Sequence, residues 1–151
     1  MQKHANLVRW RTGVPKATIL LVEDSKIQRM QSERILSKAG YTVLNANDGE
    51  QALQLARANL PDLILLDMLL PKLGGEQVLQ MLKADAATAQ IPVIALSGLT
   101  QSNEAKLMQA GAAGYFEKSR FEDSMGQEAL LNMLQRVLRE SKPTKQAIAG
   151  A

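Results

Sequence analysis

The chain has no cysteine, and only 3% of its 151 residues are aromatic. Without cysteine, neither a disulfide framework nor a thiolate metal site can form, which is typical of proteins from a reducing compartment. The scarcity of aromatic side chains argues against a base-stacking surface for single-stranded nucleic acid. We therefore expect an aliphatic core and a cytoplasmic location.

Long apolar runs are also absent. Residues 1–16 contain no apolar stretch of signal-peptide length, and no run elsewhere approaches the roughly 20 residues that cross a bilayer. We expect no membrane insertion. The apolar fraction of 46% and the charged fraction of 22% are ordinary for a globular protein, and the length suits one domain with a real core.

The net charge of +3 arises at the two ends of the chain. Six of the 18 basic residues lie in residues 1–16 and 141–151, and neither segment contains an acidic residue. Residues 17–140 therefore carry a net charge of −3. We expect a basic N-terminal extension over 1–16, a folded domain over 17–140 and a flexible C-terminal tail over 141–151. So short and sparse a basic extension makes nucleic acid an unexpected partner.

Short aliphatic runs alternate with amphipathic stretches five times along the domain. This rhythm predicts an α/β fold, in which helices cover both faces of a doubly wound, five-stranded parallel sheet. The expected strand order is 2-1-3-4-5. The predicted strands are Ala17–Val22, Thr42–Ala46, Leu63–Leu66, Pro92–Leu96 and Gly114–Phe116.

Capping residues predict several helix ends. Ser25 with Gln28, and Asn47 with Glu50, each place an N-cap oxygen three residues before a side chain that can reach back. Glycine or proline after the last turn indicates where helices stop. The predicted stops are Gly40, Pro61 and Gly111 for three helices, and Glu140 for a last helix that begins at about Phe121.

Carboxylates follow two of the predicted strands. Glu23 and Asp24 come directly after the first strand, and Asp67 comes directly after the third. These strands are neighbours in the expected order, so their carboxyl ends bring the three carboxylates into one crevice. Such a cluster costs stability unless a cation neutralises it, and an all-oxygen site suits Mg²⁺ or Mn²⁺ rather than zinc.

The same crevice suits phosphoryl chemistry, because Mg²⁺ readily takes phosphate oxygens as ligands. Asp67 can act as a nucleophile that forms an aspartyl phosphate. Ser97 and Lys118, after the fourth and fifth strands, can hold the transferred group. Each residue alone has an ordinary explanation, such as a helix cap for Asp24 or a solvated side chain for Lys118. Their joint placement at strand ends favours the phosphoryl pocket.

Four motifs resemble the receiver domains of bacterial response regulators, which have the CheY-like fold. They are ILLVEDS at 19–25, DLILLDMLLP at 62–71 with Gly75, IPVIALSG at 91–98 and GAAGYFEK at 111–118. The resemblance runs from about Thr18 to Arg139. It implies a stand-alone, phosphorylation-activated switch of a two-component system rather than an enzyme, with only self-phosphorylation and self-dephosphorylation chemistry.

Position by position, the resemblance assigns a role to each strand-end residue. Asp67 accepts the phosphoryl group, Asp24 binds the metal directly, and Glu23 binds it mainly through water. The backbone carbonyl of Leu69 completes the protein ligands. The remaining roles fall to Lys118 and Ser97, which hold the phosphoryl oxygens, and to Tyr115, the switch aromatic that turns inward as Ser97 moves.

The resemblance also implies partners. The single histidine, His4, lies in the N-terminal extension, so a histidine kinase or phosphotransfer protein must donate the phosphoryl group in trans. Output would pass to a downstream protein through the face around the fourth and fifth strands. The protein would be a monomer or a phosphorylation-dependent dimer.

Two departures from the family pattern have consequences. Ser119 and Arg120 follow Lys118, where the family usually has proline, so we expect either a trans peptide with altered lysine placement or a strained bond held by packing. Gly98 stands where alanine is more usual and keeps the position small. Leu69 and Leu99 are apolar where some receivers orient water, which predicts slow self-dephosphorylation.

Three other classes of protein share part of this pattern. Phosphatases of the haloacid dehalogenase type need an acid two residues after the nucleophile, where this chain has Leu69. A flavodoxin-like nucleotide site lacks its loop, since Glu23 and Asp24 would repel phosphate. A phosphorylation-independent, receiver-like interaction module remains the alternative, although Asp67 and Lys118 are both present.

Overall fold

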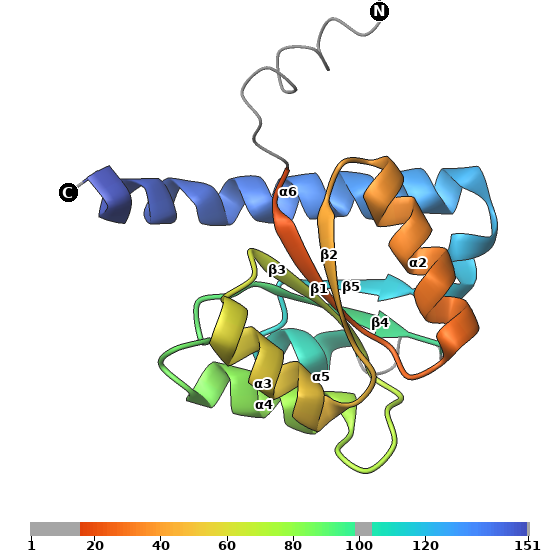
Figure 1. The fold of residues 1–151 in the computed structure, drawn as a ribbon, viewed down its shortest axis with the longest axis horizontal. Helices are drawn as coiled ribbons and strands as arrows, with labels where there is room; N and C mark the ends of the chain where they lie inside the picture. Colours follow the sequence, from red (N-terminus) through yellow and green to blue (C-terminus); the bar gives the residue numbers. More distant parts are fainter. Residues whose placement is uncertain (1–15, 99–103, 151) are drawn as a thin grey trace, which may run out of the picture.

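A five-stranded parallel sheet lies between two layers of helices (Figure 1). The computed structural model describes residues 16–98 and 104–150, with side chains up to Ser141. The strand order β2-β1-β3-β4-β5 confirms the predicted doubly wound fold, and every neighbouring pair is parallel. The strands are β1 (Thr18–Val22), β2 (Thr42–Ala46), β3 (Leu63–Asp67), β4 (Val93–Ser97) and β5 (Gly114–Glu117).

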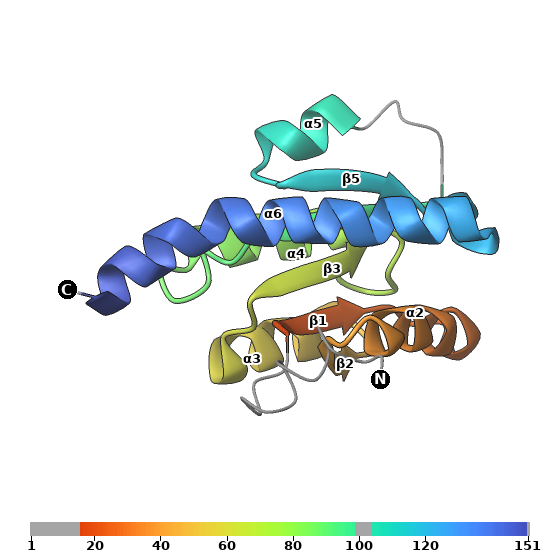
Figure 2. The same ribbon diagram turned by 90° about the horizontal axis from the view of Figure 1, so that it is seen from above.

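Helices cover both faces of this sheet (Figures 1 and 2). One layer is formed by α2 (Lys26–Lys38) and α6 (Ser124–Gly150), and the other by α3 (Gly49–Asn59), α4 (Gly75–Ala84) and α5 (Glu104–Gln109). A 3₁₀ turn, η2 (Lys118–Glu122), joins β5 to α6.

Strand β3 packs against both layers of helices, and all five of its residues are buried. Leu63 and Leu65 belong to the apolar cluster under α2 and α6, whereas Ile64 and Leu66 belong to the cluster under α3, α4 and α5. This division follows from the two-residue period of a strand and explains why the run is aliphatic throughout. Asp67, the last residue of the strand, therefore stands at the carboxyl edge of the sheet on a firmly held backbone.

The predicted cap of α2 is confirmed, but the predicted cap of α3 is wrong by one residue. The Ser25 hydroxyl accepts a hydrogen bond from the Gln28 N–H at 3.3 Å. In α3 the cap is Asp48, which accepts from the Gln51 N–H at 2.8 Å, while the Gln51 side chain accepts from the Asn47 N–H. Asp48 has extended dihedral angles, so the helix begins only at Gly49. The capping residue is therefore one position later than the sequence predicted.

The predicted helix stops at Gly40, Pro61 and Gly111 are confirmed. Gly40 and Gly111 have φ angles of 101° and 113°, which L side chains rarely adopt. Helix α3 ends at Asn59, and Leu60 takes a left-handed conformation just before Pro61.

The predicted limits of the last helix are wrong at both ends. Residues Lys118–Glu122 form η2, so α6 begins at Ser124 and not at Phe121. Asp123 is extended and accepts a hydrogen bond from the Gly126 N–H at 2.7 Å, which places the cap there. The helix passes Glu140 and continues through Pro143 to Gly150, because the Lys, Gln and Ala residues beyond the proline favour helix.

Two further expectations concern the N-terminal extension and membrane insertion. The basic extension lies almost entirely in residues 1–15, outside the described part of the chain. Among the described residues, no helix combines the length and apolar character needed to cross a membrane.

Candidate functional site

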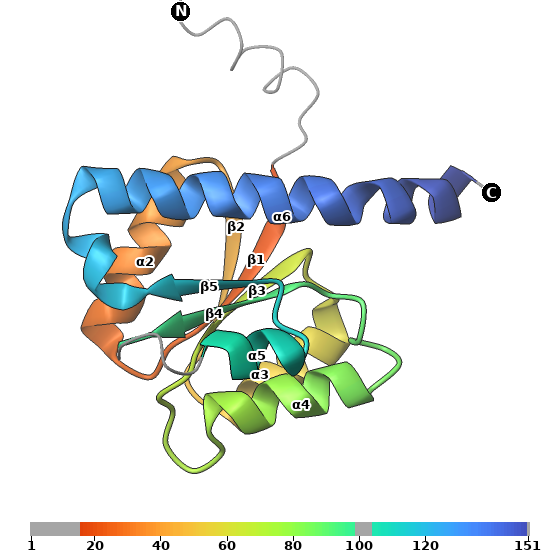
Figure 3. The ribbon, with the colours of Figure 1, turned by 180° about the vertical axis from the view of Figure 1, so that it is seen from behind.

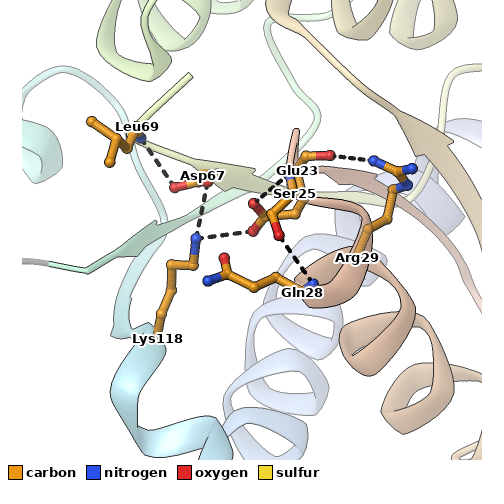
Figure 4. Close-up of polar contacts among 7 residues, drawn as sticks. All are labelled: Glu23, Ser25, Gln28, Arg29, Asp67, Leu69 and Lys118. Atoms are coloured by element: carbon orange, nitrogen blue, oxygen red, sulfur yellow. Dashed lines mark hydrogen bonds and ion pairs between the residues drawn. The ribbon is translucent and has the colours of Figure 1, made fainter. Parts of the chain in front are cut away.

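The predicted site residues meet at the carboxyl edge of the sheet. Glu23 and Asp24 follow β1, Asp67 ends β3, and Ser97 ends β4. Lys118 follows β5 and reaches back across the strand ends toward the carboxylates (Figure 4). The sequence prediction of one crevice is therefore correct in its geometry, and the chemical roles of these residues stay predictions.

Three carboxylates form the acidic part of this site. Glu23, Asp24 and Asp67 each place one oxygen within 4.8 Å of the others. Glu23 and Asp67 are buried, with exposed fractions of 2% and 1%, whereas Asp24 is exposed. An all-oxygen set with one solvent-facing member fits Mg²⁺ or Mn²⁺, which keep water ligands on their open side.

Lys118 provides the positive charge of the site. Its Nζ atom lies 3.0 Å from Glu23 Oε1 and 3.0 Å from Asp67 Oδ2 (Figure 4). Burial lowers the pKa of Lys118, but hydrogen bonds to the two carboxylates outweigh burial and raise the pKa above its usual value. The lysine is therefore charged at neutral pH and shared between the two acids.

The pKa of Glu23 is raised. Burial is the largest cause, and the charge of Asp67 acts in the same direction, while the hydrogen bond from Lys118 opposes both. A single ammonium group thus compensates the buried carboxylates only partly. The remaining negative charge favours a bound cation.

Backbone N–H groups hold the two buried carboxylates, and a side-chain donor holds the backbone of Glu23. The Leu69 N–H donates to Asp67 Oδ1 at 3.0 Å, and the Ser25 N–H donates to Glu23 Oε2 at 3.2 Å. The Arg29 guanidinium donates to the Glu23 carbonyl oxygen at 2.9 Å (Figure 4). Sequence reasoning missed Arg29, although its place in the turn after the Ser25 cap was a usable signal, because such a side chain can reach back to the loop.

Gly75 lets α4 begin against the end of β3. A Cβ atom at this position would overlap the carbonyl oxygen of Asp67 and lie 2.5 Å from the Cα of Met68. Both are backbone atoms that could yield only by moving the strand end. Gly75 is therefore required for the close approach that holds Asp67 in place.

Ser97 and Tyr115 lie on the same face of the sheet. Tyr115 pairs in register with Ala95, two residues before Ser97, and packs half-buried against the apolar cluster under α3, α4 and α5. Ser97 is 6% exposed and borders a pocket of about 240 Å³. Other residues around this pocket are Met68, Leu69, Glu76, Lys106 and Leu107.

The peptide after Lys118 is trans, because the described part of the chain contains no cis bond. The expected alternative of a strained bond is therefore wrong. The lysine reaches both carboxylates without a following proline. The turn η2 carries the lysine, and η2 lies against α6.

A 2-1-3-4-5 parallel sheet with acids, a hydroxyl and a lysine at its strand ends places the protein in the CheY-like class. The profile of the response regulator receiver domain matches residues 19–135. The chain therefore belongs to the response regulator receiver family, as its motifs predicted. Membership implies two-component signalling, in which receiver domains interact with histidine kinases and downstream targets.

Individual relatives agree with this assignment. The polar-differentiation response regulator DivK of Brucella anthropi is 34% identical over 106 residues, which are 70% of this chain and 85% of DivK. A gliding motility regulatory protein of Myxococcus xanthus is 33% identical over 138 residues, which are 91% of this chain. The chain spans only 17% of that larger protein.

A solved structure carries the metal that the acidic cluster suggests. It is the receiver domain of a sensor histidine kinase from Pseudomonas aeruginosa, with a magnesium ion coordinated in its active-site cleft. It is 32% identical, has a TM-score of 0.71, and matches 81% of this chain and 97% of that domain.

Proposed function

We propose that the protein is a phosphorylation-activated switch, with Asp67 as the phosphoacceptor. The observation that carries this proposal is the position of the Lys118 ammonium group, 3.0 Å from the buried Asp67 carboxylate and from Glu23. A buried nucleophile beside a fixed cation suits attack on a charged phosphoryl group. The donor would be a histidine kinase or phosphotransfer protein acting in trans.

Mg²⁺ or Mn²⁺ would be held by Glu23, Asp24, Asp67 and the backbone carbonyl of Leu69. The close approach of the three carboxylate oxygens supports this ligand set. When bound, the metal would neutralise charge on the phosphoryl oxygens during transfer.

In the transfer, a carboxylate oxygen of Asp67 attacks the phosphorus of a phosphohistidine. The P–O bond forms as the P–N bond breaks, and the imidazole leaves with the electrons of that bond. The Leu69 N–H and the Lys118 ammonium group each hold one oxygen of Asp67, so its orientation is set in advance. Beyond this transfer and the later hydrolysis, we propose no enzymatic turnover.

Ser97 and Tyr115 would convert phosphorylation of Asp67 into a change in the shape of the protein surface. The new phosphoryl oxygens would recruit the Ser97 hydroxyl and Lys118 from opposite sides. The pocket beside Ser97 supports this motion, because it provides space next to the face that carries Tyr115. The changed face around β4 and β5 would then bind a downstream protein, with the switch acting as a monomer or a phosphorylation-dependent dimer in the cytoplasm.

The decisive experiment treats the protein with Mg²⁺ and acetyl phosphate and measures the intact mass. Wild type should gain one phosphoryl group, and Asp67→Asn should gain none. Asp48→Asn is the matched control, because Asp48 is the N-cap of α3 and asparagine also caps a helix. Absence of an adduct on wild type, together with unchanged partner binding, would instead favour a phosphorylation-independent interaction module.

We also propose that the aspartyl phosphate is long-lived. Leu69 is 75% exposed two residues after Asp67 and offers no group that could orient water for attack. Leu99, the second residue of this hypothesis, lies outside the described residues. Loss of label within seconds from the wild-type protein would reject the proposal, and Leu69→Asn should shorten the lifetime.

A further inference from the structure

Lys118 is carried by a turn that has few local supports. None of the residues of η2 is buried. Short 3₁₀ turns also have poor hydrogen-bond geometry. Ser119 and Arg120 are exposed, and neither restricts the backbone as proline does. The lysine nevertheless reaches two carboxylates, so contacts from elsewhere must hold the turn.

The first such contact is the close approach of Gly126 in α6 to the backbone of η2. A Cβ atom on Gly126 would overlap the carbonyl oxygen of Arg120, and it would lie 2.6 Å from the carbonyl carbon and 2.9 Å from the Cβ of that residue. Gly126 is itself buried, and its N–H is bonded to the Asp123 side chain. A glycine is therefore needed for η2 and the first turn of α6 to touch.

The second contact comes from the next residue of α6. The Gln127 side-chain amide donates to the Phe121 carbonyl oxygen at 2.9 Å, which ties the other half of η2 to the helix. The Phe121 ring lies 5.5 Å from the Phe116 ring, and the Arg120 guanidinium lies 5.0 Å from the Phe116 ring on β5. The turn is thus held between α6 and the apolar core under that helix (Figure 3).

We propose that Gly126 and Gln127 are positioning residues for Lys118. They hold η2 against α6, and this attachment sets the reach of the ammonium group. The inference rests on the proposed role of Lys118 in phosphoryl transfer to Asp67. Under this proposal, the contribution of Lys118 to phosphoryl transfer depends on how α6 packs against the sheet.

The kinetic test follows Asp67 phosphorylation by acetyl phosphate. Gly126→Ala should slow the reaction about tenfold, because small displacements of a positioned group carry large rate penalties. Gln127→Glu, which keeps the shape but loses the donor, should slow it less. Neither change should have a further effect in a Lys118→Ala background, because both act through the lysine. Additive effects in that background would overturn the proposal.

Matched control variants separate positioning from general damage. Gly74→Ala introduces a methyl group at the N-cap of α4, where the nearest atom is the Gln77 side-chain oxygen at 3.9 Å. Gln135→Glu makes the same chemical change as Gln127→Glu on an exposed position of the same helix. Both should phosphorylate at the wild-type rate.

A second measurement does not require phosphoryl transfer. Acetic anhydride labelling, read out by peptide mass spectrometry, should modify Lys118 several-fold faster in Gly126→Ala and in Gln127→Glu than in wild type. Lys83 is the internal reference, since it is held by the carbonyl oxygens of Ala89 and Ile91, far along the chain from η2. Equal Lys118 labelling in wild type and variants, or a parallel rise at Lys83, would overturn the proposal.

The two measurements distinguish the two levels of inference. A wild-type protein that takes no phosphoryl group would reject the proposed function, while the labelling would still decide whether Gly126 and Gln127 hold Lys118. If Gly126→Ala does not fold, Gln127→Glu carries both measurements.

Discussion

Glu23 and Lys118 lie side by side in the site, but their backbones are held in different ways. Glu23 is held by hydrogen bonds to its own side chain and carbonyl oxygen, from the Ser25 N–H and from the Arg29 guanidinium at the start of α2. Lys118 is held through a packing contact between its turn and the helix that follows, at Gly126. We call these the acidic arm, residues 23–29, and the basic arm, η2 with the first turn of α6.

This difference indicates that the acidic and the basic parts of the site can lose their geometry independently of each other. The acidic arm forms with its own turn and needs only the start of α2. The basic arm needs α6 to be seated on the sheet, and such contacts are lost whenever that helix loosens. Metal binding should therefore follow the acidic arm, whereas phosphoryl transfer should follow both.

The largest effect is expected from Lys118→Ala, which removes the cation that the two arms share. Phosphorylation of Asp67 by acetyl phosphate should fall about 100-fold, because a fixed cation offsets the charge of the transferred group. Mg²⁺ binding should persist, since the carboxylates remain. Lys38→Ala is the control, because Lys38 is exposed in the last turn of α2. A near-wild-type rate in Lys118→Ala would argue against the assigned role of the lysine.

Arg29→Gln should damage the acidic arm alone. Loss of the hydrogen bond to the Glu23 carbonyl should weaken Mg²⁺ binding about tenfold, as outer-shell changes at metal sites commonly do. Calorimetric titration measures this directly, with Arg34→Gln on the exposed side of the same helix as the control. Unchanged Mg²⁺ affinity would show that the turn does not depend on Arg29.

Acidification should weaken Mg²⁺ binding in calorimetric titrations, and the loss should begin at a higher pH than an ordinary glutamate would require. Glu23 has a raised pKa because of its burial and the charge of Asp67, so it takes up a proton at a higher pH than an ordinary carboxyl group. A protonated Glu23 cannot serve as a full ligand, and affinity is lost as pH falls through that raised pKa. Glu23→Gln should show weaker but flatter binding as the pH falls, and equal pH profiles would contradict the assignment.

The smallest effect is expected from Gly98→Ala, between the two arms at the end of β4. An added Cβ atom would meet no atom of the described residues 16–98 and 104–150 within 4 Å. The rate of Asp67 phosphorylation and the melting temperature should both match wild type. A clear loss of either would mean that this strand end is more crowded than the structure shows.

Sequence alone predicts the acidic arm better than the basic arm. Aliphatic runs that end in Glu23 and Asp67 mark the strand ends, because a parallel sheet is buried on both faces and its ligands lie at one edge. The start of α6 was misplaced because Phe121 continues the apolar spacing of that helix. The extended Asp123 and the contact of Gly126 with Arg120 separate the turn from the helix, and that contact depends on packing that sequence spacing does not encode.

The cap of α3 illustrates a smaller ambiguity. Asn47 and Asp48 are both good caps, and each precedes a side chain that can reach back. The choice depends on where the chain leaves its extended path, which is set by packing around Gly49. A Cβ at Gly49 would lie 2.6 Å from Val78, so the start of α3 is fixed by its fit against α4.

Helix α6 is long for the sheet that it covers. Its 27 residues extend over about 40 Å, and Figures 1 and 3 show its C-terminal half passing beyond the strands. A rod of this length converts a small tilt into a large displacement. A turn of about 5° about its N-terminal end would move Gly150 by about 3 Å.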